Sequence, residues 1–187
     1  MINYNNLHQS ILFYEEKGYA RIESPWTVTE SVINITKPFF VHEIYKIETK
    51  QKCLVASAEQ SFLYLYLKGF LPKGKFCSCT PCFRDEIFDQ THSKYFMKNE
   101  LIVTDVVNEK ELQKVLGHAY NFFSSMFPGR ENFLKIKTIE LNKSYDIEFN
   151  GIELGSYGIR ECEYLSYIFA TGCAEPRLSY CQNLKLK

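Results

Sequence analysis

The sequence lacks an excess of charge of either sign. Its 22 Lys and Arg residues are balanced by 22 Asp and Glu residues among 187 positions. Proteins that bind nucleic acid mainly through the phosphate backbone usually carry a net positive field. The charge balance therefore gives no support to a nucleic-acid partner. The chain also lacks any apolar run near the roughly 20 residues that a membrane-spanning helix requires, so membrane insertion is not expected.

Export signals are lacking as well. Met1 leads directly into polar, Asn-rich sequence, without the basic and apolar segments of a secretory signal peptide. The seven cysteines are an odd number, which does not fit a closed set of disulfides. These features indicate a soluble, cytoplasmic protein with reduced thiols. A length of 187 residues with 45% hydrophobic content suits a single domain over residues 1–187 and is too short for two ordinary domains.

Helical periodicity is clear in three segments. An apolar face over residues 2–14 ends at residues 17–18, where Gly makes a natural C-terminal cap. A second helix is expected to begin at Ser57 as its N-cap and to end at residues 68–69. A third covers residues 109–126 and stops before a Pro-Gly pair. These three helices are predicted from local pattern alone.

The β-prone runs are shorter than the helices. They are expected to form strands over residues 19–23, 134–141, 145–149 and 152–160. Asn150 and Gly151 form a strong hairpin signal between the last two runs. Near the end of the chain, Gly172 is expected to open a terminal helix, with Pro176 tolerated in its first turn.

The most informative stretch is CTPCFRDE at residues 79–86, followed by FMKNEL at residues 96–101. Two β-prone runs and the polar segment between them predict a hairpin with a charged mouth. An arginine fork such as that of Arg84 holds a phosphate or a carboxylate through two parallel hydrogen bonds. Glu86 can accept from an amine, and the face of Phe96 can stack on a base. Together these residues predict a nucleotide site.

Three cysteines in this stretch suggest a metal site at first sight. Cys77, Cys79 and Cys82 follow the spacing Cys-x-Cys-x₂-Cys along the first predicted strand of the hairpin. Because side chains alternate between the two faces of a strand, Cys77 and Cys79 point one way and Cys82 the other. A zinc ion needs ligands that converge, so a zinc shared by all three thiols is not expected.

Three stretches, in order along the chain, resemble the signature motifs of class II aminoacyl-tRNA synthetases. GYARIESP at residues 18–25 resembles the first motif, the Phe-Arg-x-Glu run with Phe96 resembles the second, and GCAEPR at residues 172–177 resembles the third. The three motifs together span residues 18–177. The resemblance implies an α+β fold, in which an antiparallel β-sheet is flanked by helices. It also implies a homodimer whose interface is built by residues 3–25.

The resemblance further implies how individual residues act on ATP. Arg84 would grip the α-phosphate and the substrate carboxylate, and Glu86 would accept from the adenine amine. Phe96 would stack on the adenine, while Arg177 would cover the other face of the base and reach the γ-phosphate. Arg84 and Arg177 are thus the expected catalytic residues. No general base is needed, because the substrate carboxylate itself attacks the α-phosphate.

Two further sites combine a resemblance with an ordinary structural alternative. The run SAE at residues 57–59 resembles the loop that holds the amino-acid ammonium group in several of these enzymes; alternatively, Glu59 only favours the positive end of its helix. Asp146 and Glu153 resemble the pair that holds magnesium at the ATP phosphates in the aspartyl and asparaginyl branch, and the Asn-Gly turn is expected to fold them towards one another. Carboxylate oxygens suit Mg²⁺ shared with phosphates. The alternative is two solvent-facing acids beside a turn.

The expected activity is ATP-dependent activation of an amino acid as its aminoacyl-adenylate, with transfer to a tRNA end, a carrier protein or a small molecule. ATP and Mg²⁺ are the expected cofactors, and no length remains for an anticodon-binding domain. The third motif of the family is usually richer in glycine, whereas Cys173, Ala174 and Pro176 crowd it here. That departure favours an alternative: a non-catalytic paralogue that serves as a regulatory, scaffolding or tRNA- or nucleotide-binding protein.

Overall fold

The computed structural model of the chain describes residues 1–36, 44–47, 50–85, 93–140 and 144–185. Its helices are α1 (Tyr4–Glu16), α2 (Glu30–Thr36), α3 (Ala58–Leu67), α4 (Glu109–Met126), the 3₁₀ helix η1 (Glu131–Phe133) and α5 (Arg177–Gln182). Its strands are β1 (Ala20–Arg21), β2 (Thr27–Thr29), β3 (Lys46–Ile47), β4 (Lys52–Leu54), β5 (Lys75–Phe83), β6 (Tyr95–Val103), β7 (Leu134–Ile139), β8 (Ser144–Phe149), β9 (Ile152–Cys162) and β10 (Leu165–Glu175).

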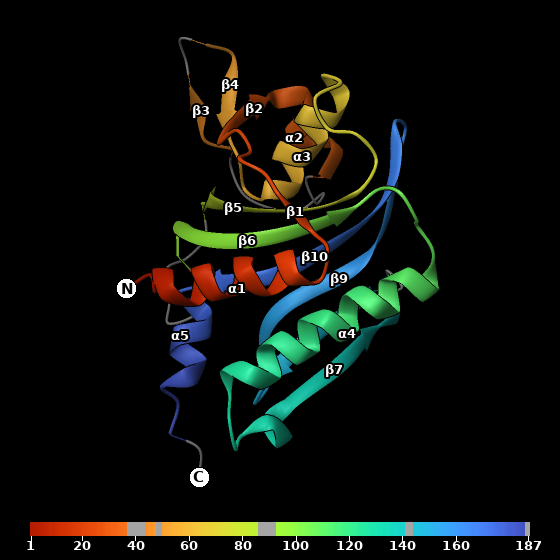
Figure 1. Ribbon diagram of the computed structural model, residues 1–187. Coiled ribbons are helices and arrows are strands. Elements are labelled where there is room, and N and C mark those ends of the chain that lie inside the picture. The colour runs from red at the N-terminus through yellow and green to blue at the C-terminus, as the bar shows by residue number, and fades with distance from the viewer. Residues whose placement is uncertain (37–43, 48–49, 86–92, 141–143, 186–187) are drawn as a thin grey trace.

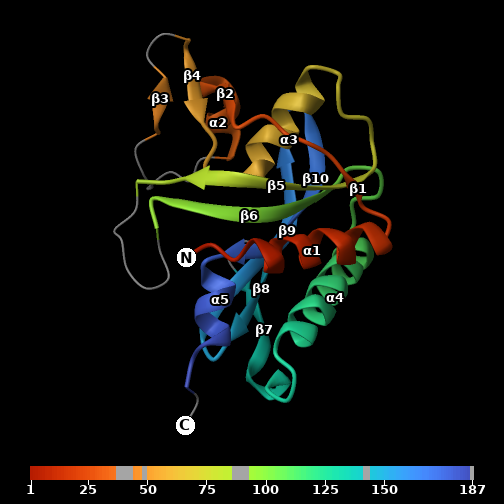
Figure 2. The same ribbon diagram turned by 60° about the vertical axis from the view of Figure 1, so that its left-hand side comes forward.

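A large mixed sheet forms the centre of the molecule (Figure 1). Its strand order is β1-β5-β6-β10-β9-β8-β7; β1 pairs parallel with β5, and the other neighbours pair antiparallel. A small sheet with the order β2-β4-β3 lies apart from it. Figures 1 and 2 show α1 and α4 on one side of the large sheet, and the small sheet with α2 and α3 on the other side. This arrangement confirms the predicted α+β architecture of an antiparallel sheet flanked by helices.

The central strands are apolar on both faces because helices cover both faces. On β6, Leu101 packs in the cluster with α1 and α4, whereas its neighbour Ile102 packs in the cluster with α2 and α3. On β10, Ile168 and Tyr167 divide between the same two clusters. All four side chains are 2% exposed or less. A strand buried on both faces reads as a continuous apolar run, which hides the alternation expected of a half-exposed strand.

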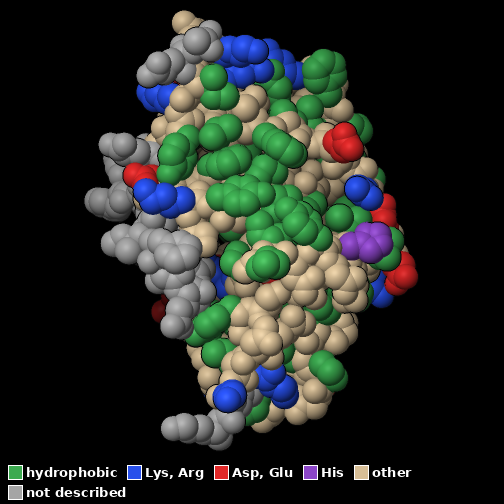
Figure 3. Space-filling model, turned by 90° about the vertical axis from the view of Figure 1, so that its left-hand side faces the viewer, with side chains coloured by type: hydrophobic (Ala, Val, Ile, Leu, Met, Phe, Trp, Pro, Cys, Tyr) green, Lys and Arg blue, Asp and Glu red, His purple; other side chains and the backbone are tan. Residues whose placement is uncertain are grey.

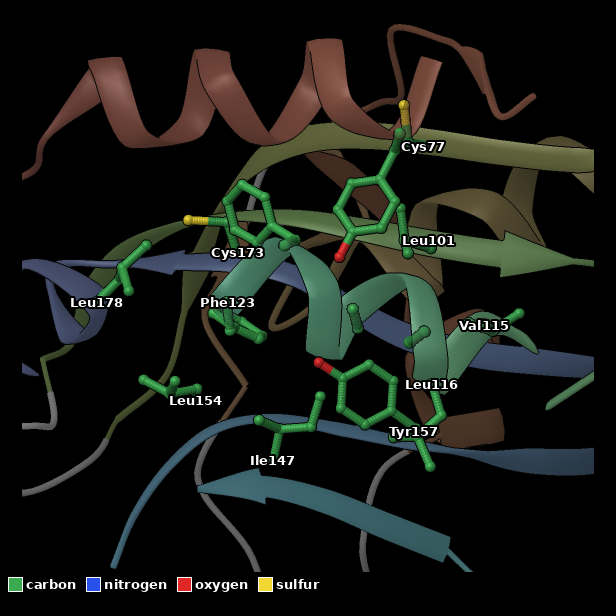
Figure 4. Packing of buried hydrophobic residues seen from close by; sticks show 14 of the residues in the cluster. Cys77, Leu101, Val115, Leu116, Phe123, Ile147, Leu154, Tyr157, Cys173 and Leu178 are labelled. Atoms are coloured by element: carbon green, nitrogen blue, oxygen red, sulfur yellow. The ribbon is translucent and has the colours of Figure 1, made fainter. Parts of the chain in front are cut away.

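Helix α4 confirms the predicted helix over residues 109–126. Asn108 caps it, since its side chain accepts from the backbone N–H of Glu111 at 2.8 Å. Figure 4 shows Val115, Leu116 and Phe123 of this helix among the buried side chains of the core between α4 and the sheet. The apolar stripe of α4 therefore closes the core on the side of the sheet that also carries α1.

Other local predictions are confirmed with modest changes. Ser57 caps α3, and its side chain accepts from the backbone N–H of Glu59 at 3.2 Å. Asn150 and Gly151 both have positive φ, as the tight turn between β8 and β9 requires. The strand predicted over residues 19–23 is present but short, because only Ala20–Arg21 pairs with β5.

The prediction that Gly172 opens the last helix is wrong. Strand β10 continues to Glu175, and α5 begins at Arg177. Gly172 is an extra residue in the strand, lying between the pairs that Thr171 and Cys173 make with β6. A Cβ atom at Gly172 would lie 2.8 Å from the ring of Tyr14, so glycine is needed here for the close approach of α1.

Candidate active site

A cavity of about 420 Å³ opens on the face of the large sheet that also carries α3. Its wall is formed by the end of β5, the first half of β6, the start of α3, much of β9, the second half of β10 and the first residue of α5, with residues of α2 and β4. Five of the residues predicted from sequence line this one cavity: Glu59, Arg84, Phe96, Glu153 and Arg177. The structure thus brings together residues from distant predicted motifs. Glu86, the predicted adenine contact, lies outside the described residues.

Arg84 and Phe96 form one wall of the cavity at the mouth of the β5–β6 hairpin. The register pairs Cys82 with Phe96, which sets Arg84 just beyond the end of the paired strand. Its guanidinium lies over the Phe96 ring, with 5.2 Å from Cζ to the ring centroid, and its Nε donates to the carbonyl of Ala56 at 3.0 Å. The backbone N–H of Arg84 donates to the carbonyl of Lys94 across the hairpin mouth. These contacts fix the plane of the guanidinium.

Glu59 lies at the start of α3 and is held by two donors. Arg160 Nη1 donates to Glu59 Oε1 at 2.6 Å, and the Tyr167 hydroxyl donates to the same oxygen at 2.8 Å. Burial raises the pKa of Glu59, and the charge of Arg160 and the hydrogen bond from Tyr167 oppose that rise. Arg160 itself stacks over Phe169, with 4.6 Å from Cζ to the centroid. Both donors bind Oε1, which orients the carboxylate within the cavity.

Glu100 is a second acid of the cavity, and it ties β6 to the start of α3. The Ser57 hydroxyl donates to Glu100 Oε1 at 2.7 Å, the backbone N–H of Ala58 donates to Oε2, and Lys98 Nζ donates to Oε1 at 2.8 Å. Burial raises the pKa of Glu100, but these three donors outweigh it and leave the pKa below its ordinary value. The buried carboxylate therefore anchors the α3 N-terminus on the sheet.

An irregularity in β9 decides which acids share a face. Glu148 pairs with Glu153 and Ile147 with Gly155, so Leu154 is an extra residue in β9. Under regular alternation, residues 153 and 156 would point to opposite sides of the strand, because they are three residues apart. The bulge places Glu153 and Ser156 on the same side, and both line the cavity.

The predicted metal pair is held by separate partners. Asp146 lies opposite Ser156, not opposite Glu153, and Ser156 Oγ donates to Asp146 Oδ1 at 2.7 Å. Glu153 Oε1 lies 3.5 Å from Arg177 Nη1. Burial raises the pKa of Asp146, and the neighbouring charges of Glu153 and Glu148 add to that rise. These three carboxylates therefore repel one another across β8 and β9.

The donor set fits a magnesium ion that is shared with a ligand. Among the residues that the structure describes, no three His, Cys, Asp or Glu side chains converge closely enough to hold a metal by themselves. Mg²⁺ needs fewer protein ligands, since it keeps several waters and takes phosphate oxygens. Burial is the main cause of the raised pKa of Asp146, and a cation between Asp146 and Glu153 would relieve the repulsion that adds to it.

Sequence reasoning missed several residues of this cavity. It gives no role to Arg160, Lys98 or Glu100, which line the cavity, or to Tyr167, which holds Glu59. Strand alternation offered a signal for Arg160, because it lies four residues after Ser156 on the same face of β9. The partner of Glu100 could not be found this way, since Ser57 and Ala58 lie on a distant segment.

Comparison with known proteins adds evidence on the fold. No protein-family profile and no curated protein sequence matches the chain. Solved structures do. The serine-tRNA ligase of Naegleria fowleri, determined with AMP, has a TM-score of 0.70 at 18% identity, and the match covers 97% of this chain and 54% of the ligase chain. The seryl-tRNA synthetase of Pyrococcus horikoshii, determined with ATP, has a TM-score of 0.71 at 18% identity, and the match covers 93% of this chain and 48% of the synthetase chain. PylSc of Desulfitobacterium hafniense, a pyrrolysyl-tRNA synthetase, has a TM-score of 0.72 at 16% identity, and the match covers 94% of this chain and 66% of the PylSc chain.

The chain has the class II aminoacyl-tRNA synthetase-like fold. The resemblance of its three motifs is thereby confirmed at the level of the fold. The chain spans about half to two thirds of the length of these class II proteins. Within the described part of the chain, none of the helices is both long and apolar enough to cross a membrane.

Proposed function

We propose that this class II-like chain binds ATP and an amino acid in the cavity and joins them as an aminoacyl-adenylate. The observation that carries the proposal is the convergence of Glu59, Arg84 and Arg177 on one cavity from three distant segments. Two of these side chains are cations that suit the phosphates and the substrate carboxylate. The third is a half-buried acid that suits an ammonium group. These charges are complementary to those of an amino acid bound beside a nucleoside triphosphate.

The proposed reaction needs positioning more than acid–base chemistry. The substrate carboxylate oxygen attacks the α-phosphorus, a new C–O–P linkage forms, and the bond to the β-phosphate oxygen breaks as pyrophosphate leaves. Arg84 stabilises the charge on the α-phosphate and orients the carboxylate, while Arg177 holds the leaving phosphates. Glu59 accepts from the substrate ammonium group. Bound Mg²⁺ would supply further neutralisation of the phosphates, and Asp146 and Glu153 are the residues that would hold it.

The base is proposed to stack at Phe96. The guanidinium of Arg84 already lies over one face of this ring, so the adenine would use the opposite face. Stacking on an aromatic side chain is worth about 1–3 kcal/mol per base and tolerates any base, so the adenine amine needs a further acceptor. Glu86 keeps that role as a prediction.

The partners follow from the same proposal. The chain is proposed to act as a cytoplasmic homodimer and to pass the amino acid to a tRNA end, a carrier protein or a small molecule. Figure 3 shows hydrophobic side chains gathered on the side of the molecule where α1 begins. Two large apolar residues of the segment expected at the interface are well exposed, Tyr4 at 62% and Leu12 at 47%. Trp26, which directly follows that segment, is 59% exposed. Closed two-fold pairing is the commonest way to cover such a surface.

A non-catalytic nucleotide-binding role is the second candidate. It is favoured by the contact between Arg177 and Glu153, which directs the proposed γ-phosphate cation onto the proposed metal ligand. ATP binding without adenylate formation would be the outcome in that case.

Amino-acid-dependent exchange of pyrophosphate into ATP separates the two candidates. Each of the twenty amino acids is tested with the wild type, Arg84→Ala and Arg84→Lys. We expect exchange with at least one amino acid and a loss of roughly a hundred-fold in Arg84→Ala, the scale for one preorganised charge-stabilising donor. Arg84→Lys should recover little, because an ammonium group lacks the planar fork.

Lys135→Ala is the control, because it removes one positive charge from an exposed position on β7 and should leave exchange unchanged. A folded wild type that binds ATP without exchange, and whose ATP affinity survives Arg84→Ala, would exclude the proposed chemistry.

A further inference from the structure

Arg177 occupies the joint between β10 and α5, and this joint is held from behind. The strand ends at Glu175, the helix begins at Arg177, and the Arg177 side chain lines the cavity on one face of the sheet. Helix α1 covers the opposite face (Figure 2). Any side chain of α1 that grips the joint therefore acts on Arg177 without entering the cavity.

Asn6 of α1 is such a side chain. Its Nδ2 donates to Glu175 Oε1 at 2.6 Å, to Gln182 Oε1 at 3.0 Å and to Ser179 Oγ at 3.3 Å. The Asn6 amide thus contacts Glu175, at the end of β10, and both Ser179 and Gln182 of α5. Asn6 is 4% exposed and Glu175 is fully buried, so water does not replace these bonds easily.

Two more side chains extend this contact along α1. Ser10 Oγ accepts from Asn99 Nδ2 at 2.9 Å, and the Tyr14 hydroxyl donates to the Gly172 carbonyl at 3.4 Å. Asn6, Ser10 and Tyr14 are spaced four residues apart, so they lie on one face of the helix. All three are buried against the segment of sheet that backs the cavity. Helix α1 is therefore held against β10 at both ends of this face and against β6 between them, over two turns.

Helix α5 cannot hold Arg177 by itself. It has six residues, and Pro176 at its N-cap provides no side-chain hydrogen bond. Isolated helices of this length are not stable, so tertiary contacts set its position. Its C-terminal end is held separately, because Arg130 donates to the carbonyls of Gln182 and Leu184 at 2.9 and 3.0 Å. The N-terminal end, which carries Arg177, is held by the buried Leu178 and by the hydrogen bonds around Asn6.

We infer that Asn6 is a positioning residue for Arg177, and that helix α1 sets the ATP-phosphate end of the cavity through the Asn6–Glu175–Ser179 cluster. The inference rests on the proposed function. Loss of the Asn6 donor lets the first turn of α5 shift, and shifts of about 1 Å in a reacting group can cost roughly a hundred-fold in rate. The amino-acid end is built on α3 and β5, so Glu59 and Arg84 keep their places.

The test is steady-state exchange kinetics on Asn6→Asp. This change keeps the shape of the side chain, removes the donor and sets a carboxylate against Glu175. We expect the KM for ATP to rise about tenfold or more while the KM for the amino acid changes less than twofold. Asn5→Asp is the matched control, since it makes the same substitution one residue earlier at an exposed position and should change neither constant.

A double variant, Asn6→Asp with Glu175→Gln, reverses donor and acceptor. The amide introduced at position 175 can then donate to the carboxylate introduced at position 6, and the net charge is that of the wild type. The KM for ATP should therefore return to within about threefold of the wild-type value. Ser179→Ala is a milder single change that loses the bonds of Ser179 to Asn6 and Glu175. It should raise the KM for ATP severalfold, and it keeps the test usable if Asn6→Asp does not fold.

Each result has a distinct meaning. Equal rises in both KM values, or an unchanged KM for ATP in Asn6→Asp or Ser179→Ala, would overturn the positioning role while leaving the proposed function standing. A folded wild type that shows neither exchange nor ATP binding by calorimetry would overturn the proposed function, and the positioning role with it.

Discussion

Replacing Glu100 by glutamine tests the charged anchor between β6 and α3. In the wild type the carboxylate accepts from Ser57, Ala58 and Lys98 with two oxygens. Glutamine keeps one acceptor oxygen and puts an NH₂ group in place of the other. That NH₂ must then face either the Ala58 N–H or the Lys98 ammonium, and both are donors.

The expected loss follows from these contacts. Breaking a buried ion pair by removing one partner costs about 3–5 kcal/mol, and hydrogen bonds to a charged group contribute about 1.5–3 kcal/mol each. The Lys98 side chain is 16% exposed, so water recovers part of its solvation. We expect Glu100→Gln to lower the free energy of unfolding by about 3 kcal/mol, which for a chain of this size lowers Tm by about 9 °C.

The pH dependence gives the sharper check. The folded-state pKa of Glu100 is lowered, so its contribution to stability is present above the unfolded-state pKa of about 4.3 and is lost as pH falls through the folded value. The stability gap between wild type and Glu100→Gln should therefore shrink below about pH 4.

Urea unfolding of both proteins from neutral to acidic pH measures this gap. Glu161→Gln, at an exposed position on β9, is the control and should shift the free energy of unfolding by less than about 0.5 kcal/mol. A gap at neutral pH no larger than that control, or a gap that does not shrink in acid, would refute the reasoning.

Three further predictions concern the cavity wall, the metal and the assembly. Gly155→Ala would place a methyl group 2.6 Å from Thr171 Cβ and should lower the free energy of unfolding in urea by about 1–3 kcal/mol. In the control Gly117→Ala, inside α4, the new methyl group meets nothing within 4 Å and should raise that free energy by up to about 1 kcal/mol. Similar values for both variants would contradict the packing. Glu153→Gln should raise the Mg²⁺ concentration needed for half-maximal exchange more than the KM for the amino acid, because an amide is a poorer ligand for a hard cation; an unchanged Mg²⁺ requirement would remove Glu153 from the metal. Sedimentation at micromolar concentration should give twice the chain mass of 21.9 kDa, and a clean monomer would exclude the proposed dimer.

The sequence was a good guide wherever a signal was local. Helix periodicity, the Ser57 cap and the Asn150-Gly151 turn depend on neighbouring residues, and all three appear in the structure. The cavity could be anticipated because its residues sit in short motifs whose order along the chain is informative. The resemblance of residues 57–59 predicts a substrate contact at Glu59, and Glu59 lines the cavity.

Errors and omissions arose where long-range contacts decide the backbone. Gly172 fits a helix start by its residue type, but pairing with β6 and the approach of Tyr14 extend the strand past it. Likewise, nothing near Leu154 marks it as an extra residue. Strict alternation would have separated Glu153 from Ser156, and only the register with β8 shows that they share a face.

The extra residue in β9 sets regularity against chemistry. A designer who idealised this strand at its present length would pair Leu154 with Glu148, and the ladder with β8 would gain an unbroken run of paired backbone groups. That one-residue change of register would turn Glu153 away from Ser156 and Asp146, and would move one half of the strand by a residue relative to the cavity. A stabilised version of this protein that lacked the irregularity could thus fold well and still have lost one wall of its site. Screens for thermal stability alone would select against the feature that the cavity requires.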